Sequence, residues 1–274
     1  MIKKYYILLR FLRFWRAAQT KYDVHSPFVF EFVEKVLENK QWYYAFSEIE
    51  PIRSRILKNK TEINVTDFGA GSHLLKDNKR KISDIAKTSL TPSDRCRFLF
   101  RLVEFWQPKT LLEFGTSLGI ATLYQAAPCP KSKFITLEGC PNIATIAREN
   151  FKLFGLADID CLVGEFEQTL PQAIQQLGNL DYVFFDGNHQ KEATIRYFER
   201  CLPFANEKSL FVFDDIYWSE GMAEAWEKIK KNPKVRLTID LFFFGLVFFR
   251  NEQHAVEHLK LVPASWKPWR LGFF

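Results

Sequence analysis

Acidic residues stand at the ends of five short apolar runs in the second half of the sequence. They are Glu113, Glu138, Glu165, Asp186 and the pair Asp214-Asp215. A single acid in such a place is commonly a helix cap or a solvated loop charge, but acids at most of these ends together favour a binding site. Phosphate-bearing cofactors prefer free N–H groups and positive charge, so NAD and ATP are disfavoured. S-Adenosylmethionine, which is cationic at sulfur and nitrogen and has no phosphate, fits an acidic site.

A glycine-containing turn follows the first run and reads Gly115-Thr116-Ser117-Leu118-Gly119. It lacks the G-x-G-x-x-G fingerprint of dinucleotide-binding proteins, and the chain has no G-x-x-x-x-G-K-[ST] loop. Glu113 is placed to orient this turn or to meet the amino acid part of the cofactor. Glu138, at the end of the second run, is placed to accept both ribose hydroxyls.

The elements that must position these residues alternate regularly from about residue 96. Predicted strands cover residues 110–114, 134–138, 159–163, 182–185 and 210–213, and predicted helices cover 98–106, 120–127, 143–151, 170–177, 193–201 and 221–229. Repeated strand-then-helix units predict a parallel sheet covered by helices on both faces. Such sheets bind ligands at the carboxyl ends of their strands, which is where the acids stand.

Two closing apolar runs, 235–241 and 245–249, are separated by a short turn and predict antiparallel neighbours. The expected fold is therefore α/β, a Rossmann-like, doubly wound, seven-stranded sheet whose last strand is antiparallel. We expect a helical N-terminal extension and connecting loop over residues 1–95, a cofactor-binding domain over 96–251 and a tail over 252–274.

The N-terminal extension begins with a basic and aromatic segment. Residues 1–22 contain six Lys or Arg residues and no acid. Such a helix can lie on an anionic membrane or on nucleic acid, or it can dock on the domain and solvate its arginines. We favour docking, because its apolar residues nearly encircle the helix. Ser26-Pro27 predicts the start of the next helix.

A second glycine-rich loop, Asp67 to Ser72, lies in the long connection 58–95. No strand-and-helix series follows it directly, so we do not expect it to be the main cofactor loop. It can be a lid or substrate loop with Ser72 or His73 in contact. The pair His254 and His258 has no third metal ligand nearby in sequence and is expected on an exposed helix face.

Composition excludes several classes of protein. The 274 residues are 47% hydrophobic and 26% charged, as in globular domains. The longest apolar run, 241–249, is far shorter than the roughly 20 residues of a membrane-spanning helix. The chain has five cysteines and no C-x-x-C pair, which favours a reducing cytoplasm.

The residues named above resemble those of a known family. Glu113 to Gly119 is similar to motif I of class I S-adenosylmethionine-dependent methyltransferases. Phe184-Phe185-Asp186-Gly187-Asn188-His189, followed by Phe213-Asp214-Asp215-Ile216-Tyr217-Trp218, resembles catechol and caffeoyl-CoA type O-methyltransferases and their bacterial relatives. The resemblance covers roughly residues 96–250.

The resemblance implies roles for individual residues. Those expected at the methionine end of the cofactor are Glu113, Gly115, Thr116, Ser117 and Gly119. Glu138 would hold the ribose, and Asp186 would lie near the sulfonium. The adenine-side segment would be Gly164, Glu165 and Phe166.

In the metal-dependent members of this family, Mg²⁺ is held at the positions of Asp186, Asp214 and Asp215. The last position is usually Asn and is Asp here. Three carboxylates can still bind a hard divalent ion, or Asp215 can simply cap the next helix in a metal-free site.

Methyl transfer requires removal of the acceptor proton. His189 takes the position of a lysine that serves catechol-type enzymes as base or orienter, and a neutral imidazole can play that part. It can equally be an exposed loop histidine. Tyr217 and Trp218 can wall an aromatic acceptor or pack the sheet edge.

These observations predict an S-adenosylmethionine-dependent methyltransferase (EC 2.1.1) that acts on a small-molecule hydroxyl, with a homodimer possible. Two alternatives stay open at this point. One is methylation of a tRNA wobble-uridine hydroxyl, which the basic segment would favour. The other is a non-catalytic binding module with a degenerate site.

Overall fold

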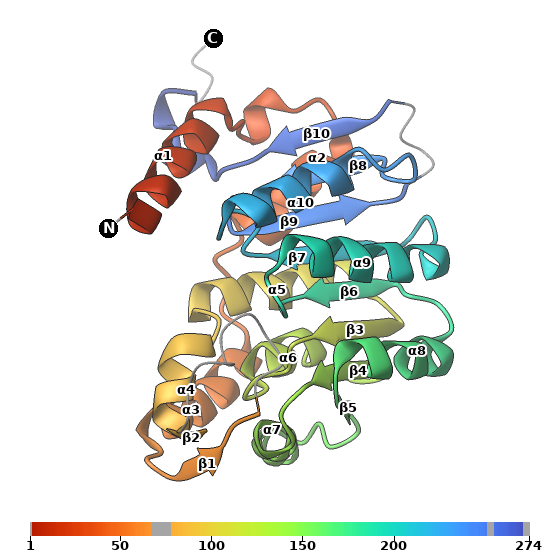
Figure 1. Cartoon of the computed structure of the whole chain (residues 1–274). Helices are drawn as coiled ribbons and strands as arrows, with labels where there is room; N and C mark the ends of the chain where they lie inside the picture. The colour runs from red at the N-terminus through yellow and green to blue at the C-terminus, as the bar shows by residue number, and fades with distance from the viewer. Residues whose placement is uncertain (1, 67–77, 251–254, 271–274) are drawn as a thin grey trace. The chain divides into compact units, whose positions relative to one another are not determined.

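The computed structural model describes residues 2–66, 78–250 and 255–270 (Figure 1). The loop 67–72, with Ser72 and His73, lies outside the described residues, as does His254. The chain forms two compact units, one from residues 40–180 and the other from 1–39 together with 181–274. The boundaries expected after residues 95 and 251 do not coincide with these units and stay predictions.

The unit of residues 40–180 is built on three parallel strands in the order β3-β4-β5. They are β3 (Thr110–Phe114), β4 (Lys133–Glu138) and β5 (Asp160–Val163), and each is followed by a helix: α6 (Ile120–Ala126), α7 (Pro141–Phe154) and α8 (Phe166–Leu177). Glu113 is the register partner of Thr136 on β4. The parallel strand-then-helix pattern predicted for this region is confirmed.

Upstream, the same unit contains α3 (Tyr44–Lys58), β1 (Glu62–Asn64), β2 (Lys79–Lys81), α4 (Ile82–Ser89) and α5 (Ser93–Trp106). The stretch expected to be a plain connection therefore holds an antiparallel strand pair and a helix. The prediction missed α4 because Lys87, Thr88 and Ser89 obscure its short apolar face, on which Ile82, Ile85 and Ala86 are buried.

The other unit contains five strands in the order β6-β7-β9-β8-β10. They are β6 (Tyr182–Phe185), β7 (Leu210–Asp214), β8 (Leu237–Asp240), β9 (Phe244–Phe248) and β10 (Glu257–Lys260), with α9 (Lys191–Cys201) after β6 and α10 (Glu220–Lys230) after β7. As predicted, β9 runs antiparallel to β7 and β8. The tail adds a strand that was not predicted. This strand, β10, pairs in parallel with β8.

The N-terminal part of this unit is helical, as expected. It consists of α1 (Ile2–Ala17), the short turn η1 (Lys21–Asp23), α2 (Pro27–Phe32) and the π-helical turn η2 (Val33–Leu37). The Ser26 side chain accepts a hydrogen bond from the Val29 N–H, and Pro27 takes the first helical position. No helix among the described residues has the length and apolar character needed to cross a bilayer.

Candidate active site

The turn after β3 is held by backbone hydrogen bonds to the neighbouring strand. The N–H groups of Gly115 and Thr116 both donate to the carbonyl of Leu137, at 3.0 and 3.2 Å. Gly115, Ser117 and Gly119 all have positive φ, of 94°, 49° and 80°, a region that glycine enters without strain. The predicted glycines therefore stand at two of the three positions of the turn that have a left-handed backbone.

Gly119 is also required by packing. A Cβ atom at this position would lie 2.6 Å from Cε1 of Phe151 on α7 and 3.2 Å from Cβ of Ala147. Both the backbone angle and the aromatic neighbour thus exclude a side chain. The close approach fixes the start of α6 against α7.

Glu113 lies at the inner side of this turn and is fully buried. Thr122 and Thr136 donate hydroxyl hydrogen bonds to its Oε2 at 2.6 Å each, and Gln125 donates to its Oε1 at 2.7 Å. Burial raises its pKa to about 7, although the three donors oppose this shift. Glu113 was expected either to orient the turn or to meet the amino acid part of the cofactor. Its contacts fit the first role, because they join α6 and β4 to β3.

Gln125 has a second feature that bears on this carboxyl group. Its Oε1 is buried and has no hydrogen-bond partner among the described residues. The amide nitrogen and oxygen of glutamine can exchange places by rotation. A protonated Glu113 could then donate to the Gln125 oxygen, so the pocket can satisfy either protonation state.

Glu138 connects the turn to the next strand end. Its Oε2 accepts the N–H of Ser117 at 2.8 Å, and its Oε1 accepts the N–H of Cys140 at 2.9 Å. Two backbone amides thus set the orientation of a half-buried carboxylate. The residues expected to meet the methionine end and the ribose are therefore brought together in one unit.

The predicted adenine-side segment adjoins the same place. The N–H of Gly164 donates to the carbonyl of Glu138 at 2.9 Å, and Gly164 has a φ of 145°. The Phe166 ring packs edge-on against Phe114, with centroids 5.5 Å apart. Glu165 is exposed and directly precedes α8.

Two side chains that touch the turn were missed by sequence reasoning. Ser89, at the end of α4, lies 2.9 Å from Ser117 between hydroxyl oxygens. Asn150 on α7 is buried and donates to the carbonyl of Leu118 at 2.9 Å. Neither lies near the turn in sequence, so no local pattern points to them. Thr122 and Gln125 could have been found, because they lie three apart on the helix that follows Glu113.

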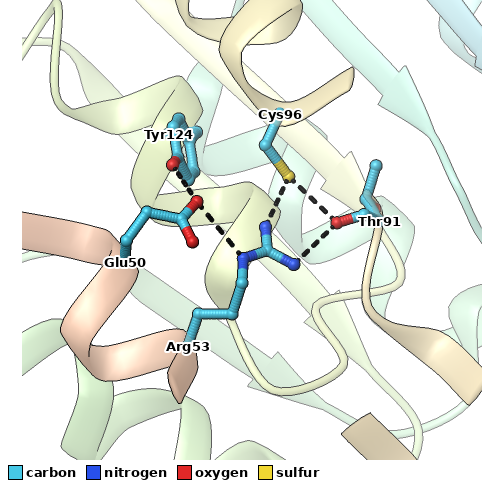
Figure 2. A network of polar contacts seen from close by, with 5 residues as sticks. All are labelled: Glu50, Arg53, Thr91, Cys96 and Tyr124. Atoms are coloured by element: carbon cyan, nitrogen blue, oxygen red, sulfur yellow. Dashed lines mark hydrogen bonds and ion pairs between the residues drawn. The ribbon is translucent and has the colours of Figure 1, made fainter. Parts of the chain in front are cut away.

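A buried polar network holds α6 on its other side (Figure 2). Tyr124 on α6 donates to Glu50 on α3 at 2.6 Å, and the Arg53 Nε lies 3.5 Å from the same oxygen. Arg53 also donates to the Thr91 carbonyl at 2.9 Å and to the Cys96 sulfur at 3.2 Å. The helix after the turn, α6, is therefore hydrogen-bonded to Glu113 on one side and to α3 on the other.

In the other unit, Asp186 and His189 follow β6 and lie close together. The His189 Nε2 is 3.6 Å from Asp186 Oδ1, and the two side chains are 30% and 17% exposed. Asn188 between them has a φ of 51°, a left-handed conformation that asparagine adopts more readily than most residues. A partly exposed imidazole beside a carboxylate is an arrangement able to accept a proton.

Asp214 and Asp215 lie at the end of β7. Asp214 is buried, and Asp215 is half-buried with a φ of 49°. Ser219, not Asp215, caps the next helix by accepting the Met222 N–H at 3.1 Å. The suggestion that Asp215 caps this helix is therefore wrong.

The three carboxylates expected to hold Mg²⁺ do not form a ligand group. Within residues 2–66, 78–250 and 255–270, no three or more His, Cys, Asp or Glu side chains are arranged to hold an ion. Asp186, Asp214 and Asp215 all lie in those ranges. The metal therefore stays a prediction, and no chemical step is assigned to it.

Tyr217 packs inside its unit. Its hydroxyl donates to Asp240 Oδ2 at 2.5 Å, and its ring lies 5.3 Å from Phe242. Burial and the neighbouring carboxylate raise the pKa of Tyr217 above its usual range. Trp218, by contrast, is 45% exposed. Of the two aromatic residues, Trp218 is the one left accessible to an acceptor.

A family model described as O-methyltransferase matches residues 70–242. The chain belongs to the O-methyltransferase family. The match begins upstream of residue 96, so the family region includes α4, whose Ser89 touches the turn.

Two curated relatives carry the name catechol O-methyltransferase. The protein from Niastella koreensis is 32% identical over 123 residues, which cover 44% of this chain and 55% of the relative. The protein from Mycobacterium tuberculosis is 31% identical over 128 residues, or 46% and 56% of the two chains. The chain thus spans about half the length of the curated relatives it matches.

A solved structure supports the fold. The O-methyltransferase from Bacillus cereus in complex with SAH superposes with a TM-score of 0.53 at 20% identity, over 80% of this chain and 96% of that one. Likeness at this identity concerns the fold alone. The Rossmann-like α/β fold predicted from the sequence is therefore confirmed.

Proposed function

We propose that this chain is an S-adenosylmethionine-dependent methyltransferase that methylates a hydroxyl group of a small molecule. The observation that carries the proposal is the glycine turn 115–119 locked to Glu138 through the Ser117 N–H. Membership of the O-methyltransferase family and the catechol O-methyltransferase relatives favour the same reaction.

The cofactor role belongs to the unit of residues 40–180. Glu138 would accept the ribose hydroxyls, and the turn Gly115 to Gly119 would receive the methionine end. The segment Gly164 to Phe166 would meet the adenine. Glu113 would contribute by keeping the turn in place, since its own carboxyl group is buried and engaged. When bound, S-adenosylmethionine supplies an electrophilic methyl group.

The acid–base role belongs to Asp186 and His189. With S-adenosylmethionine held by the turn Gly115 to Gly119 and by Glu138, the acceptor oxygen would take the methyl group, and the sulfur would keep the electron pair of the broken carbon–sulfur bond. The acceptor proton passes to the imidazole of His189, and Asp186 at 3.6 Å stabilises the imidazolium that results.

Calorimetry with S-adenosylmethionine tests the cofactor assignment. Binding is expected for the unaltered chain and weaker binding for Glu138→Gln, whereas a non-catalytic module with a degenerate site would bind nothing. Activity should then be compared on catechols and on tRNA at rising salt. A reaction on RNA alone, lost steeply with salt, would contradict the small-molecule substrate.

A further inference from the structure

We propose that the outer face of α1 docks this protein on the surface of an anionic lipid bilayer, with the helix lying flat in the headgroup region. This inference does not depend on the methyl-transfer activity. It rests on the way α1 divides its side chains between the unit it packs on and the surrounding water.

The inner face of α1 is firmly held. Phe14 is buried, and the rings of Phe11 and Phe14 lie 5.0 and 5.4 Å from Phe242 in the β8–β9 turn. Arg10 lies 5.6 Å from the Tyr217 ring centre. The docking predicted from the sequence therefore occurs, but it uses only one side of the helix.

The end of α1 is fixed as well. The buried Lys267 donates to the carbonyls of Arg16 and Ala18, at 3.3 and 2.5 Å. Gln19 joins the strand region through its N–H, which donates to Lys260, and its carbonyl, which accepts from Val262. The orientation of α1 within its unit is therefore determined by contacts at both its middle and its end.

The outer face carries large apolar side chains in water. Tyr5, Leu8, Leu9 and Leu12 are 64%, 53%, 36% and 51% exposed. We call these four residues the outer stripe. Their spacing of three, four and seven residues places them on one side of the helix. Single exposed apolar residues are ordinary, but a contiguous row of them marks an interaction site.

Charge identifies the partner. Arg13 and Arg16 are exposed beside the outer stripe, and residues 1–22 contain six basic residues and no acid. A helix with an apolar row bordered by arginines is the kind that lies in the interface of an anionic membrane. A second copy pairing stripe to stripe would instead bring like charges together.

Exposed tryptophans adjoin the helix. Trp269 is 66% exposed and packs edge-on against Trp15 at 5.7 Å, while Trp266 is 44% exposed and contacts Phe11 at 6.1 Å. Tryptophan is enriched at the level of lipid headgroups. RNA would be recognised by aromatic stacking and cations, whereas leucines, which make up most of the outer stripe, contribute by burying apolar surface, as lipid binding requires.

Flotation of the full chain with vesicles tests the proposal. The protein should bind vesicles of equimolar phosphatidylcholine and phosphatidylglycerol, bind those of phosphatidylcholine about tenfold more weakly, and lose affinity at high salt. Leu8→Asp with Leu12→Asp should reduce binding about tenfold or more. The matched control is Leu57→Asp with Leu153→Asp, which alters exposed leucines on α3 and α7 and should leave binding unchanged.

A second measurement does not require a disruptive variant. All five native cysteines are buried, so a polarity-sensitive dye can be attached to Leu9→Cys and, as control, to Leu153→Cys. Only the Leu9 dye should shift to the blue with anionic vesicles. Absence of binding to anionic vesicles, equal binding by the two double variants, or a dimer that becomes a monomer on altering the outer stripe without any lipid binding would overturn the proposal.

Discussion

The acidic strand ends of the two units are held in different ways. Glu113 and Glu138 together accept five hydrogen bonds, three from side chains on neighbouring elements and two from backbone amides. Asp186 and His189 instead lie 3.6 Å apart on one loop and are partly exposed. Glu113 is built into the core, Glu138 is half-buried and bound to two backbone amides, and Asp186 and His189 lie on a turn.

This difference matches what each role demands. A cofactor site gains affinity when its geometry exists before binding, because no ordering remains to be done. A group that accepts a proton must be reached by the acceptor and must change charge during the reaction. Burial of the kind that surrounds Glu113 would oppose such a change of charge.

The largest effect is expected at the partly exposed pair of Asp186 and His189. His189→Ala should lower kcat about 10²- to 10⁴-fold through loss of the base, while the dissociation constant for S-adenosylmethionine stays the same. The matched control is His258→Ala, which removes a histidine bonded to Thr238 on β8. Steady-state kinetics with calorimetry measures both quantities, and an unchanged kcat would remove His189 from the mechanism.

A side chain at Gly119 tests how tightly the glycine turn is packed against α7. Gly119→Ala should lower the free energy of unfolding by about 3–4 kcal/mol through backbone strain and overlap with Phe151 and should abolish cofactor binding. Gly155→Ala has a similar φ of 87° but meets no atom within 4 Å, so it measures strain alone. Chemical denaturation compares the two, and equal losses would show that the Phe151 contact is unimportant.

The pH dependence of stability tests the burial of Glu113. Because its folded pKa is raised to about 7, the folded state binds more protons than the unfolded state between about pH 4.5 and 7. Stability should therefore fall as pH rises through that window, by at most about 3 kcal/mol. Glu113→Gln, which has no proton to lose, should flatten this part of the curve relative to the unaltered chain. Identical slopes would contradict the raised pKa.

The smallest effect is expected at Glu138. Glu138→Gln keeps one acceptor oxygen but turns an amide N–H₂ toward the N–H of Ser117 or Cys140, so cofactor affinity should fall about tenfold. Glu149→Gln on the exposed side of α7 is the control and should leave affinity unchanged. Calorimetry decides, and equal affinities for the two variants would show that Glu138 does not hold the cofactor.

Local patterns in the sequence were sufficient for the alternating elements, the glycine turn and the closing hairpin. Each of these depends on residues close in sequence, such as Gly115 and Gly119 or the apolar runs that become β8 and β9. The same patterns missed α4, because its apolar face is short, and β10, because a strand of mixed polarity forms only when β8 lies beside it.

Local sequence was enough for the fold class and for the order of the strands' acidic ends, since periodicity and charge are properties of neighbours along the chain. It did not separate the inner from the outer residues of α1, because apolar side chains nearly encircle that helix; the packing of Phe11 and Phe14 against Phe242 made that division. Tertiary structure decided that Glu113 is buried and engaged, that Ser89 and Asn150 reach the turn, and that Asp186, Asp214 and Asp215 form no metal-ligand group. Burial and hydrogen bonding depend on which distant segments pack together, and no spacing within one segment records that.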